Sequence, residues 1–177
     1  MGWQDDILGF WFGLTAEQYW KADPALDAEI GERFHAMWEA ERENVPEAFL
    51  ASPRDAVAAV ILFDQFPRNM LRGHADQFST DPLALAVAKA AVDRRLDEAM
   101  SPAERGFLYM PFQHSEDLQD QKRSVALFTA LGDDLQLGFA IKHHDVIERF
   151  GRFPHRNPIL GRAPRPAEIE AGDVVPW

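Results

Sequence analysis

Four dipeptides, each a helix-capping residue followed directly by proline, constrain the fold of this chain more than any other feature. They are Asp23-Pro24, Ser52-Pro53, Asp81-Pro82 and Ser101-Pro102. An Asp or Ser side chain accepts hydrogen bonds from the first N–H groups of a helix, and proline suits the first helical position, where its missing N–H would have no partner. No segment alternates apolar and polar residues long enough to predict a strand. The pattern therefore predicts an all-α protein.

The same signals, combined with apolar periodicity, predict seven or eight helices joined by short loops. We expect them near residues 4–13, 15–21, 24–42, 53–65, 81–95, 102–109, 115–131 and 134–150. The last 27 residues contain five of the 12 prolines, so we expect irregular chain there with one helical turn near 167–171. A length of 177 residues fits a single helical domain over 1–177.

Composition excludes several classes of protein. The chain is 46% hydrophobic with 13 Phe and 5 Trp, so it can form a core. It contains no Cys, which excludes disulfides, thiolate metal sites and cysteine nucleophiles. A net charge of -11 argues against nucleic acid or an anionic membrane as a partner. No apolar run reaches the roughly 20 residues of a membrane span and no basic segment opens the chain, so we expect a cytoplasmic protein and leave homo-oligomers open.

Three predicted helices each place a polar residue within an apolar face. These residues are Asp64, Gln121 and His143, and His114 directly precedes the second of the helices. At about 100° per residue, His143 lies at the centre of its face and His144 on the flank. Burying unpaired polar groups is costly, so we expect Asp64, Gln121 and His143 to share partners in one polar cluster. The alternative is that each is structural, for example a histidine bonded to a backbone carbonyl.

A Phe-Pro step followed by an Arg-Asn pair occurs twice, directly in 66–69 and with His155 in between in 153–157. We expect the proline to end the preceding helix. The planar guanidinium of the following Arg suits a carboxylate or phosphate, although it can also cap helix carbonyls. Residues 142–166 carry six Lys or Arg against two acids. This segment therefore predicts a local anion site, unless its bases pair with the acidic first third of the chain.

These residues belong to longer motifs that resemble a known family. The motifs are Leu62-Phe63-Asp64-Gln65-Phe66-Pro67-Arg68-Asn69-Met70, Phe107 to Asp117 with Gln121, Arg149 to Asn157, and the opening Gly9-Phe10-Trp11-Phe12-Gly13. Over nearly the whole chain they are similar to the bacterial domain-of-unknown-function 924 family. The resemblance implies an all-helical, tetratricopeptide-like stack of antiparallel helix pairs and no established activity. The chain lacks the tetratricopeptide repeat of about 34 residues, so that comparison concerns shape only.

Our main hypothesis is a buried polar pocket that binds a small anionic metabolite and hydrolyses or isomerises it by histidine and carboxylate acid–base chemistry. The candidate acid–base residues are His143, His114 and Asp64. The candidate ligand-binding residues are Arg68, Asn69, Gln121, Arg152, His155, Arg156 and Asn157.

No cofactor is predicted, because the chain has no glycine-rich nucleotide motif and no Gly-x-Ser-x-Gly nucleophile turn. We also expect no metal. A divalent ion is the minor alternative, with His114, His143, Asp64 and Asp117 as its ligands, since imidazole and carboxylate suit zinc, manganese or iron.

The alternative function is a non-catalytic peptide- or protein-binding module of tetratricopeptide-like shape, with aromatic residues lining a groove. The candidate aromatics are Trp3, Trp11, Phe12, Trp20 and Trp38. Buried tryptophans would indicate a scaffold around a polar pocket, and tryptophans facing solvent would indicate a partner surface. Trp38 continues a helical stripe that starts at Leu26, so we assign it to packing.

Overall fold

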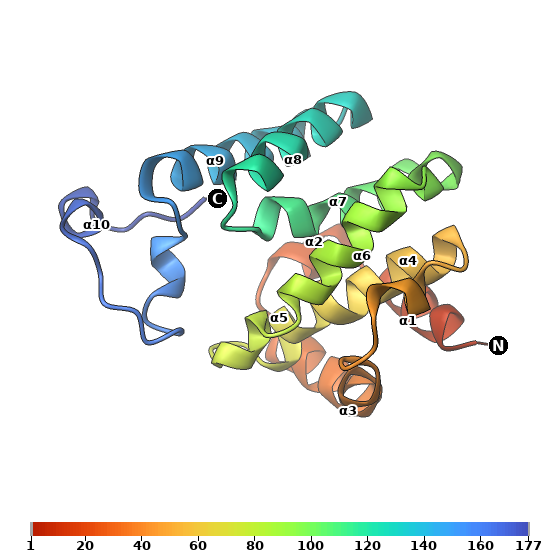
Figure 1. Cartoon of the computed structure of the whole chain (residues 1–177). Helices are drawn as coiled ribbons and strands as arrows, with labels where there is room; N and C mark the ends of the chain where they lie inside the picture. Colours follow the sequence, from red (N-terminus) through yellow and green to blue (C-terminus); the bar gives the residue numbers. More distant parts are fainter. Residues whose placement is uncertain (1, 177) are drawn as a thin grey trace. The chain divides into compact units, whose positions relative to one another are not determined.

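The computed structural model describes residues 2–176, and all regular secondary structure in that range is helical. The all-α prediction is confirmed. The chain divides into two compact units, Met1–Leu108 and Tyr109–Trp177 (Figure 1). We call them the N-terminal and C-terminal units. The tetratricopeptide-like stacking and the single domain over 1–177 stay predictions. No helix within residues 2–176 is long and apolar enough to cross a membrane.

Within residues 2–108, the N-terminal unit contains six helices besides the first half of α7, with short 3-10 turns between them. The helices are α1 (Trp3–Trp11), α2 (Ala16–Trp20), α3 (Pro24–Glu41), α4 (Pro53–Val60), α5 (Phe66–Met70), α6 (Asp81–Asp93) and α7 (Pro102–His114). The 3-10 turns are η1 (Pro46–Phe49), η3 (Ala75–Phe78) and η4 (Leu96–Ala99). Helices α3 and α6 begin within one residue of their predicted starts. Local capping signals therefore set these boundaries.

Three of the four predicted caps form as expected and one does not. The Ser101 hydroxyl accepts a 3.3 Å hydrogen bond from the Glu104 N–H at the start of α7. The Asp23 side chain accepts hydrogen bonds from the first turn of α3, and Ser52 accepts one from the N–H of Asp55 at the start of α4. Asp81 is not a cap, because α6 begins at Asp81 itself after Thr80. Its carboxylate instead binds a distant arginine, which is described below.

The centre of the N-terminal unit is a continuous buried helix. It consists of α4, a π-helical turn η2 (Ile61–Gln65) and the start of α5. Every residue from Ala56 to Phe66 is buried. The one-sided apolar stripe that we expected here is therefore wrong, because a helix surrounded by protein needs no polar face.

The expected helix end at Pro67 is also wrong. Pro67 has no N–H, so the carbonyl of Phe63 one turn earlier loses its backbone donor. The π-helical turn widens the backbone at this point, and the Phe66 N–H bonds to the Ile61 carbonyl. The Thr80 hydroxyl donates a hydrogen bond of 2.7 Å to the Phe63 carbonyl. Because the freed carbonyl has a new donor, the helix continues through the proline.

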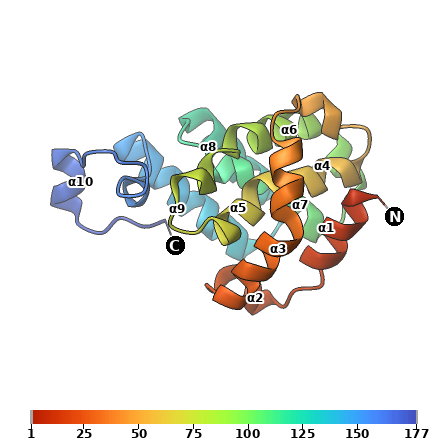
Figure 2. The ribbon, with the colours of Figure 1, turned by 90° about the horizontal axis from the view of Figure 1, so that it is seen from below.

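Helix α3 packs its apolar face against this buried helix. The face consists of Leu26, Ile30, Phe34 and Trp38, all buried, which confirms the assignment of Trp38 to packing. Phe34 stacks on Phe66 with 4.5 Å between ring centroids. The Trp38 indole donates a 3.0 Å hydrogen bond to the Thr80 hydroxyl. Helix α3 lies along α5, and Figure 2 shows α1, α2 and α3 on one side of the unit.

The C-terminal unit is built on a helical hairpin of α8 (Leu118–Leu131) and α9 (Asp134–Phe150), which lie side by side in Figure 1. Gly132, with φ +76°, ends α8 in the left-handed conformation and makes the short turn possible. The predicted 134–150 helix is confirmed. The one expected at 115 begins at Leu118, because Asp117 is the cap. Helix α7 reaches His114 rather than 109, and Pro111 lies inside it.

The end of the chain follows the expectation of irregular structure with one helical turn. After α9 come a 3-10 turn, η5 (Pro154–Arg156), and one short helix, α10 (Pro166–Ala171). Figures 1 and 2 both show α10 beyond the end of α9. This segment contributes most of the site described next.

Candidate functional site

Three histidines of the C-terminal unit lie in one cluster, two of them against the Phe153 ring and the third against one of those two. The His143 and His155 rings each lie 5.5 Å from the Phe153 ring, measured between centroids. The His114 ring lies 6.2 Å from that of His143. These side chains come from the end of α7, the middle of α9 and the turn η5. The structure therefore brings together the three histidines that the sequence analysis singled out.

His143 is buried, with 7% of its surface exposed, whereas His144 is only half-buried, as predicted. The Nδ1 atom of His143 lies 2.8 Å from the carbonyl oxygen of Phe139, one turn earlier in α9. Burial, followed by the nearby His114 and Arg156, lowers the pKa of His143 from 6.5 to about 3. The ring is therefore neutral at neutral pH, with Nδ1–H donating to the carbonyl. This geometry matches the structural alternative, and a catalytic role for His143 stays a prediction.

Arg156 places a positive charge within the histidine cluster. Its guanidinium carbon lies 4.7 Å from the centre of the Phe153 ring, and Nη2 donates a 3.0 Å hydrogen bond to the His114 carbonyl. Burial is the main cause that lowers the pKa of His155 from 6.5 to about 4, and the charge of Arg156 is the next. The charge of Glu116 raises the pKa of His155 but does not cancel these two effects. The surroundings of His155 are therefore electropositive.

A cavity of about 750 Å³ opens beside His155. It is lined by Pro154, His155, Asn157, Pro158, Arg162, Pro164, Glu168, Ile169, Gly172, Asp173, Val174 and Val175. Two predicted ligand-binding residues, His155 and Asn157, thus share one cavity. Arg162 and Glu168 also line it and were not predicted. The excess of basic residues in 142–166 was the only signal that pointed toward Arg162.

A chain of polar contacts fixes this cavity wall. Both oxygens of Glu116 accept hydrogen bonds from Arg162, at 2.7 and 3.0 Å. The Arg162 Nε donates to the Asn157 side-chain oxygen at 2.9 Å, and the Asn157 amide donates to Glu168 at 2.9 Å. Glu168 in turn binds Arg152 through two contacts of 2.6 and 2.8 Å. Hydrogen bonding to Arg152 is the largest cause that lowers the pKa of Glu168 to about 2.

Gln121 is fully buried and connects α7 to α8. Its side-chain amide donates hydrogen bonds of 2.7 and 2.6 Å to the carbonyls of Gln113 and Ser115. Its Oε1 has no hydrogen-bond partner within the described part of the chain. A ligand-binding role for Gln121 stays a prediction, and its visible role is to hold the turn between the two helices.

The remaining predicted residues, Asp64, Arg68 and Asn69, lie in the N-terminal unit. Asp64 is fully buried, and its carboxylate lies 3.2 Å from the Arg68 guanidinium. Arg68 also binds both oxygens of Asp81, at 2.8 and 2.9 Å. Burial opposes the charge of Arg68, but Asp64 and Asp81 outweigh it and raise the pKa of the guanidinium. Asn69 donates a 2.9 Å hydrogen bond to Asp27.

These contacts limit what the predicted arginines can offer a ligand. An anion at Arg68 would compete with the Asp81 carboxylate, and one at Arg152 would compete with Glu168. The expected cluster of Asp64 with Gln121 and His143 joins residues of the two units, and it stays a prediction.

Comparison with known proteins agrees with the helical architecture. The family model for bacterial proteins of unknown function, DUF924, matches residues 7–171. The chain belongs to the DUF924 family. A solved structure of a protein of unknown function from Agrobacterium tumefaciens, ATU0120, is similar to it with a TM-score of 0.87 and 40% sequence identity, over 95% of each chain. No curated protein matches the chain. The comparisons thus show the family and the fold of this DUF924 member.

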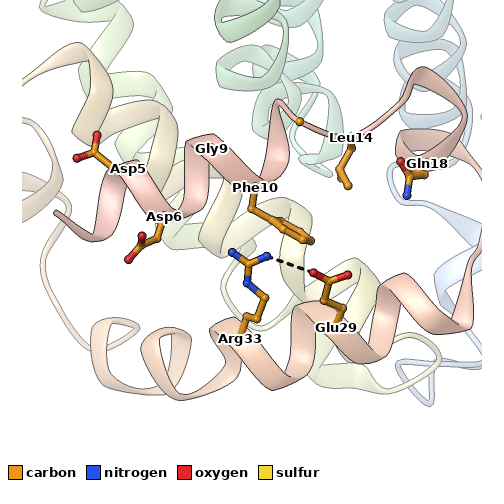
Figure 3. Close-up of a pocket in the computed structure, with 9 residues that line it drawn as sticks. Asp5, Asp6, Gly9, Phe10, Leu14, Gln18, Glu29 and Arg33 are labelled. Carbon is orange, nitrogen blue, oxygen red and sulfur yellow. Dashed lines mark hydrogen bonds and ion pairs between the residues drawn. The ribbon is translucent and has the colours of Figure 1, made fainter. Parts of the chain in front are cut away.

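A second pocket lies in the N-terminal unit of the DUF924 member and has a volume of about 500 Å³. Figure 3 shows the Phe10 ring of α1 facing the Arg33 side chain of α3. The Arg33 guanidinium carbon lies 4.4 Å from the centre of that ring, and the guanidinium is 3.2 Å from Glu29. Asp5 and Asp6 complete the acidic edge of this open groove. None of these residues was predicted as a site.

Metal-binding groups gather at one place in residues 2–176. His144, Asp145 and Glu148 of α9 have possible ligand atoms within 4.8 Å of one another. Both acids are exposed to solvent. Within the C-terminal unit of the DUF924 member, the candidate ligands His114, His143 and Asp117 do not belong to this group. Exposed carboxylates usually interact with water alone, so we assign no metal here.

The tryptophans are divided between core and surface. Trp11 and Trp38 are buried, and Trp3 is half-buried. Trp20 is 56% exposed and lies beside Tyr19, with 6.2 Å between the ring centroids. The two buried tryptophans agree with a scaffold role. The peptide-binding alternative for this DUF924 member stays a prediction.

Proposed function

We propose that the cavity beside His155 binds a small anionic ligand, and that His155 exchanges a proton with it. One observation supports this more than any other: His155, Asn157 and Arg162 line a single cavity of about 750 Å³. A concave site with a few converging polar groups is the usual form of a small-molecule site.

The charge distribution favours a negative ligand. The charges of Arg156 and Arg162 both lower the pKa of His155, so the potential at this ring is positive. Arg162 has five N–H donors, of which four bind Glu116, Asn157 and the Phe153 carbonyl. The fifth, on Nη1, has no hydrogen-bond partner among residues 2–176 and is available to a ligand. A negative group beside His155 therefore gains one hydrogen bond and a favourable field.

His155 suits acid–base chemistry better than His143 does. It lines the cavity, whereas the lining does not include His143. With its pKa lowered to about 4, the His155 ring is neutral at neutral pH and can accept a proton. Glu116 and Glu168 are each held by an arginine, and we assign the proton transfers of a hydrolysis or an isomerisation to the imidazole rather than to Asp173, the other carboxylate of the lining. We therefore place any catalysis at His155.

The test is isothermal titration calorimetry with inorganic phosphate and with small mono- and dicarboxylates as probes. A bound anion favours the protonated ring, so its affinity should rise as the pH falls from 7 to 5, with uptake of a proton. His155→Gln should weaken binding and abolish the pH dependence. His144→Gln, a half-buried histidine outside the cavity lining, is the matched control. Equal affinities for the parent protein and His155→Gln at every pH would disprove the proposal.

A further inference from the structure

We propose that the ligand of this cavity is an amphiphilic monocarboxylic acid, whose carboxylate binds beside His155 and Arg162 and whose aliphatic chain lies against Ile169 and Val175. This inference rests on the proposed function and adds the chemical class of the ligand. The inference is based on the cavity wall that is formed by the C-terminal segment.

That wall exposes apolar side chains to the cavity. Ile169 is 66% exposed and Val175 is 45% exposed, and both line the cavity. Large apolar side chains that remain exposed together at a concave surface mark a binding site more often than isolated ones do. Helix α10 buries Glu168 rather than Ile169, so its apolar residue is turned away from the core.

Polar contacts, and not packing of Ile169, hold this wall in place. The ion pair between Arg152 and Glu168 holds α10, and the Arg165 guanidinium donates a 3.0 Å hydrogen bond to the Phe150 carbonyl at the end of α9. Val174, next to Val175, packs against the apolar cluster around Phe150. Because other contacts anchor the segment, Ile169 and Val175 are available to a ligand.

The charges of the lining favour a head group with one negative charge. Glu168 and Asp173 are also part of the lining, and the charge of Glu168 is matched by Arg152. Each of these carboxylates repels a phosphate dianion about twice as strongly as a monocarboxylate, because Coulomb repulsion scales with the charge of the ligand. A small inorganic anion would also leave the apolar wall in contact with water. A monocarboxylate with an aliphatic chain can bind the positive side of the cavity and cover the apolar wall at the same time.

The experiment is a calorimetric series with acetate, butyrate, hexanoate and octanoate, and with inorganic phosphate for comparison. Each added methylene that is removed from water should raise the affinity about two- to fourfold, until the apolar wall is covered. Phosphate should bind more weakly than butyrate. A series with no dependence on chain length would overturn the inference.

Single substitutions test the contributions of the apolar wall and of the His155 side to binding separately. Ile169→Ser and Val175→Ser should flatten the dependence on chain length, with a larger loss of affinity for octanoate than for acetate. Leu135→Ser is the matched control, because Leu135 is 67% exposed on α9 and does not line the cavity. His155→Gln should weaken all members of the series by a similar factor. Circular dichroism and the melting temperature of each variant check that it folds.

The outcomes distinguish this inference from the proposed function. If acetate and phosphate bind with a requirement for His155, but longer acids bind no better, only the chemical class proposed here fails. If no anion binds in a manner that depends on His155, the proposed function fails as well. If long acids bind independently of His155 but require Ile169, the cavity is an apolar surface and both proposals fail.

Discussion

Arg162 binds both oxygens of the Glu116 carboxylate, at 2.7 and 3.0 Å, although 46 positions of the chain separate them. The same carboxylate accepts a 2.7 Å hydrogen bond from the Phe153 N–H. Glu116 lies between α7 and α8, and Phe153 follows α9. This ion pair therefore attaches the C-terminal segment to the helical hairpin and sets one wall of the cavity.

Glu116→Gln should destabilise the C-terminal unit. The variant keeps the shape of the side chain but removes the charge that Arg162 and the Phe153 N–H bind. Hydrogen bonds to charged groups contribute about 1.5 to 3 kcal/mol, and we expect a loss of that size in the free energy of unfolding, measured with urea. Glu148→Gln, exposed on α9, should change it by less than about 0.5 kcal/mol. Equal losses in the two variants would contradict the assignment.

His143 should make the protein less stable in acid. Its pKa is about 3 when folded and 6.5 when exposed, so between these values the unfolded chain binds a proton that the folded chain does not. The free energy of unfolding should therefore fall as the pH falls from about 6.5 to 3, with a slope of up to about 1.4 kcal/mol per pH unit. His155 acts in the same direction between about 4 and 6.5.

The variant His143→Gln should reduce that slope, because glutamine does not titrate, at a cost of about 1 to 3 kcal/mol in stability at pH 7. Urea unfolding at several pH values measures both effects. His144→Gln, on the same helix, should retain the slope of the parent protein. An unchanged slope in His143→Gln would show that other groups cause the acid sensitivity.

Thr80→Val should destabilise the N-terminal unit. The hydroxyl accepts from the Trp38 indole and donates to the Phe63 carbonyl, which Pro67 has left without a backbone donor. Valine has a similar shape but leaves two buried polar groups unpaired, which should cost about 2 to 4 kcal/mol. Chemical unfolding followed by tryptophan fluorescence measures the loss. Thr129→Val, exposed on α8, is the control and should have little effect.

Arg68→Met should be among the most destabilising substitutions in the N-terminal unit. It leaves the carboxylate of Asp64, which is 0% exposed, without its cation, and loss of one partner of a buried pair costs about 3 to 5 kcal/mol. Adding Asp64→Asn should recover part of the stability. Arg33→Met removes an exposed ion pair with Glu29 and should cost less than about 1 kcal/mol. If the double variant is no more stable than Arg68→Met, the two charges are not coupled.

Local signals in the sequence determined much of the helical framework. The boundaries of α9, the capped start of α3 and the helical turn at α10 agree with prediction, because capping residues and prolines act on the next few backbone groups. The burial of Trp38 could also be predicted, since the helical period places it one turn after Phe34.

Only the tertiary structure decided which groups meet across long stretches of chain. Asp81 has the sequence signature of a cap but binds Arg68, and Pro67 has the signature of a helix end but lies inside a helix. In the C-terminal unit, the cavity beside His155 depends on Glu116 and Glu168, neither of which has a local signal for its arginine partner. The physical reason is the distance along the chain over which each interaction acts. A cap bonds to its own helix within three residues. The partner of an ion pair or of a freed carbonyl is instead determined by the packing of other helices.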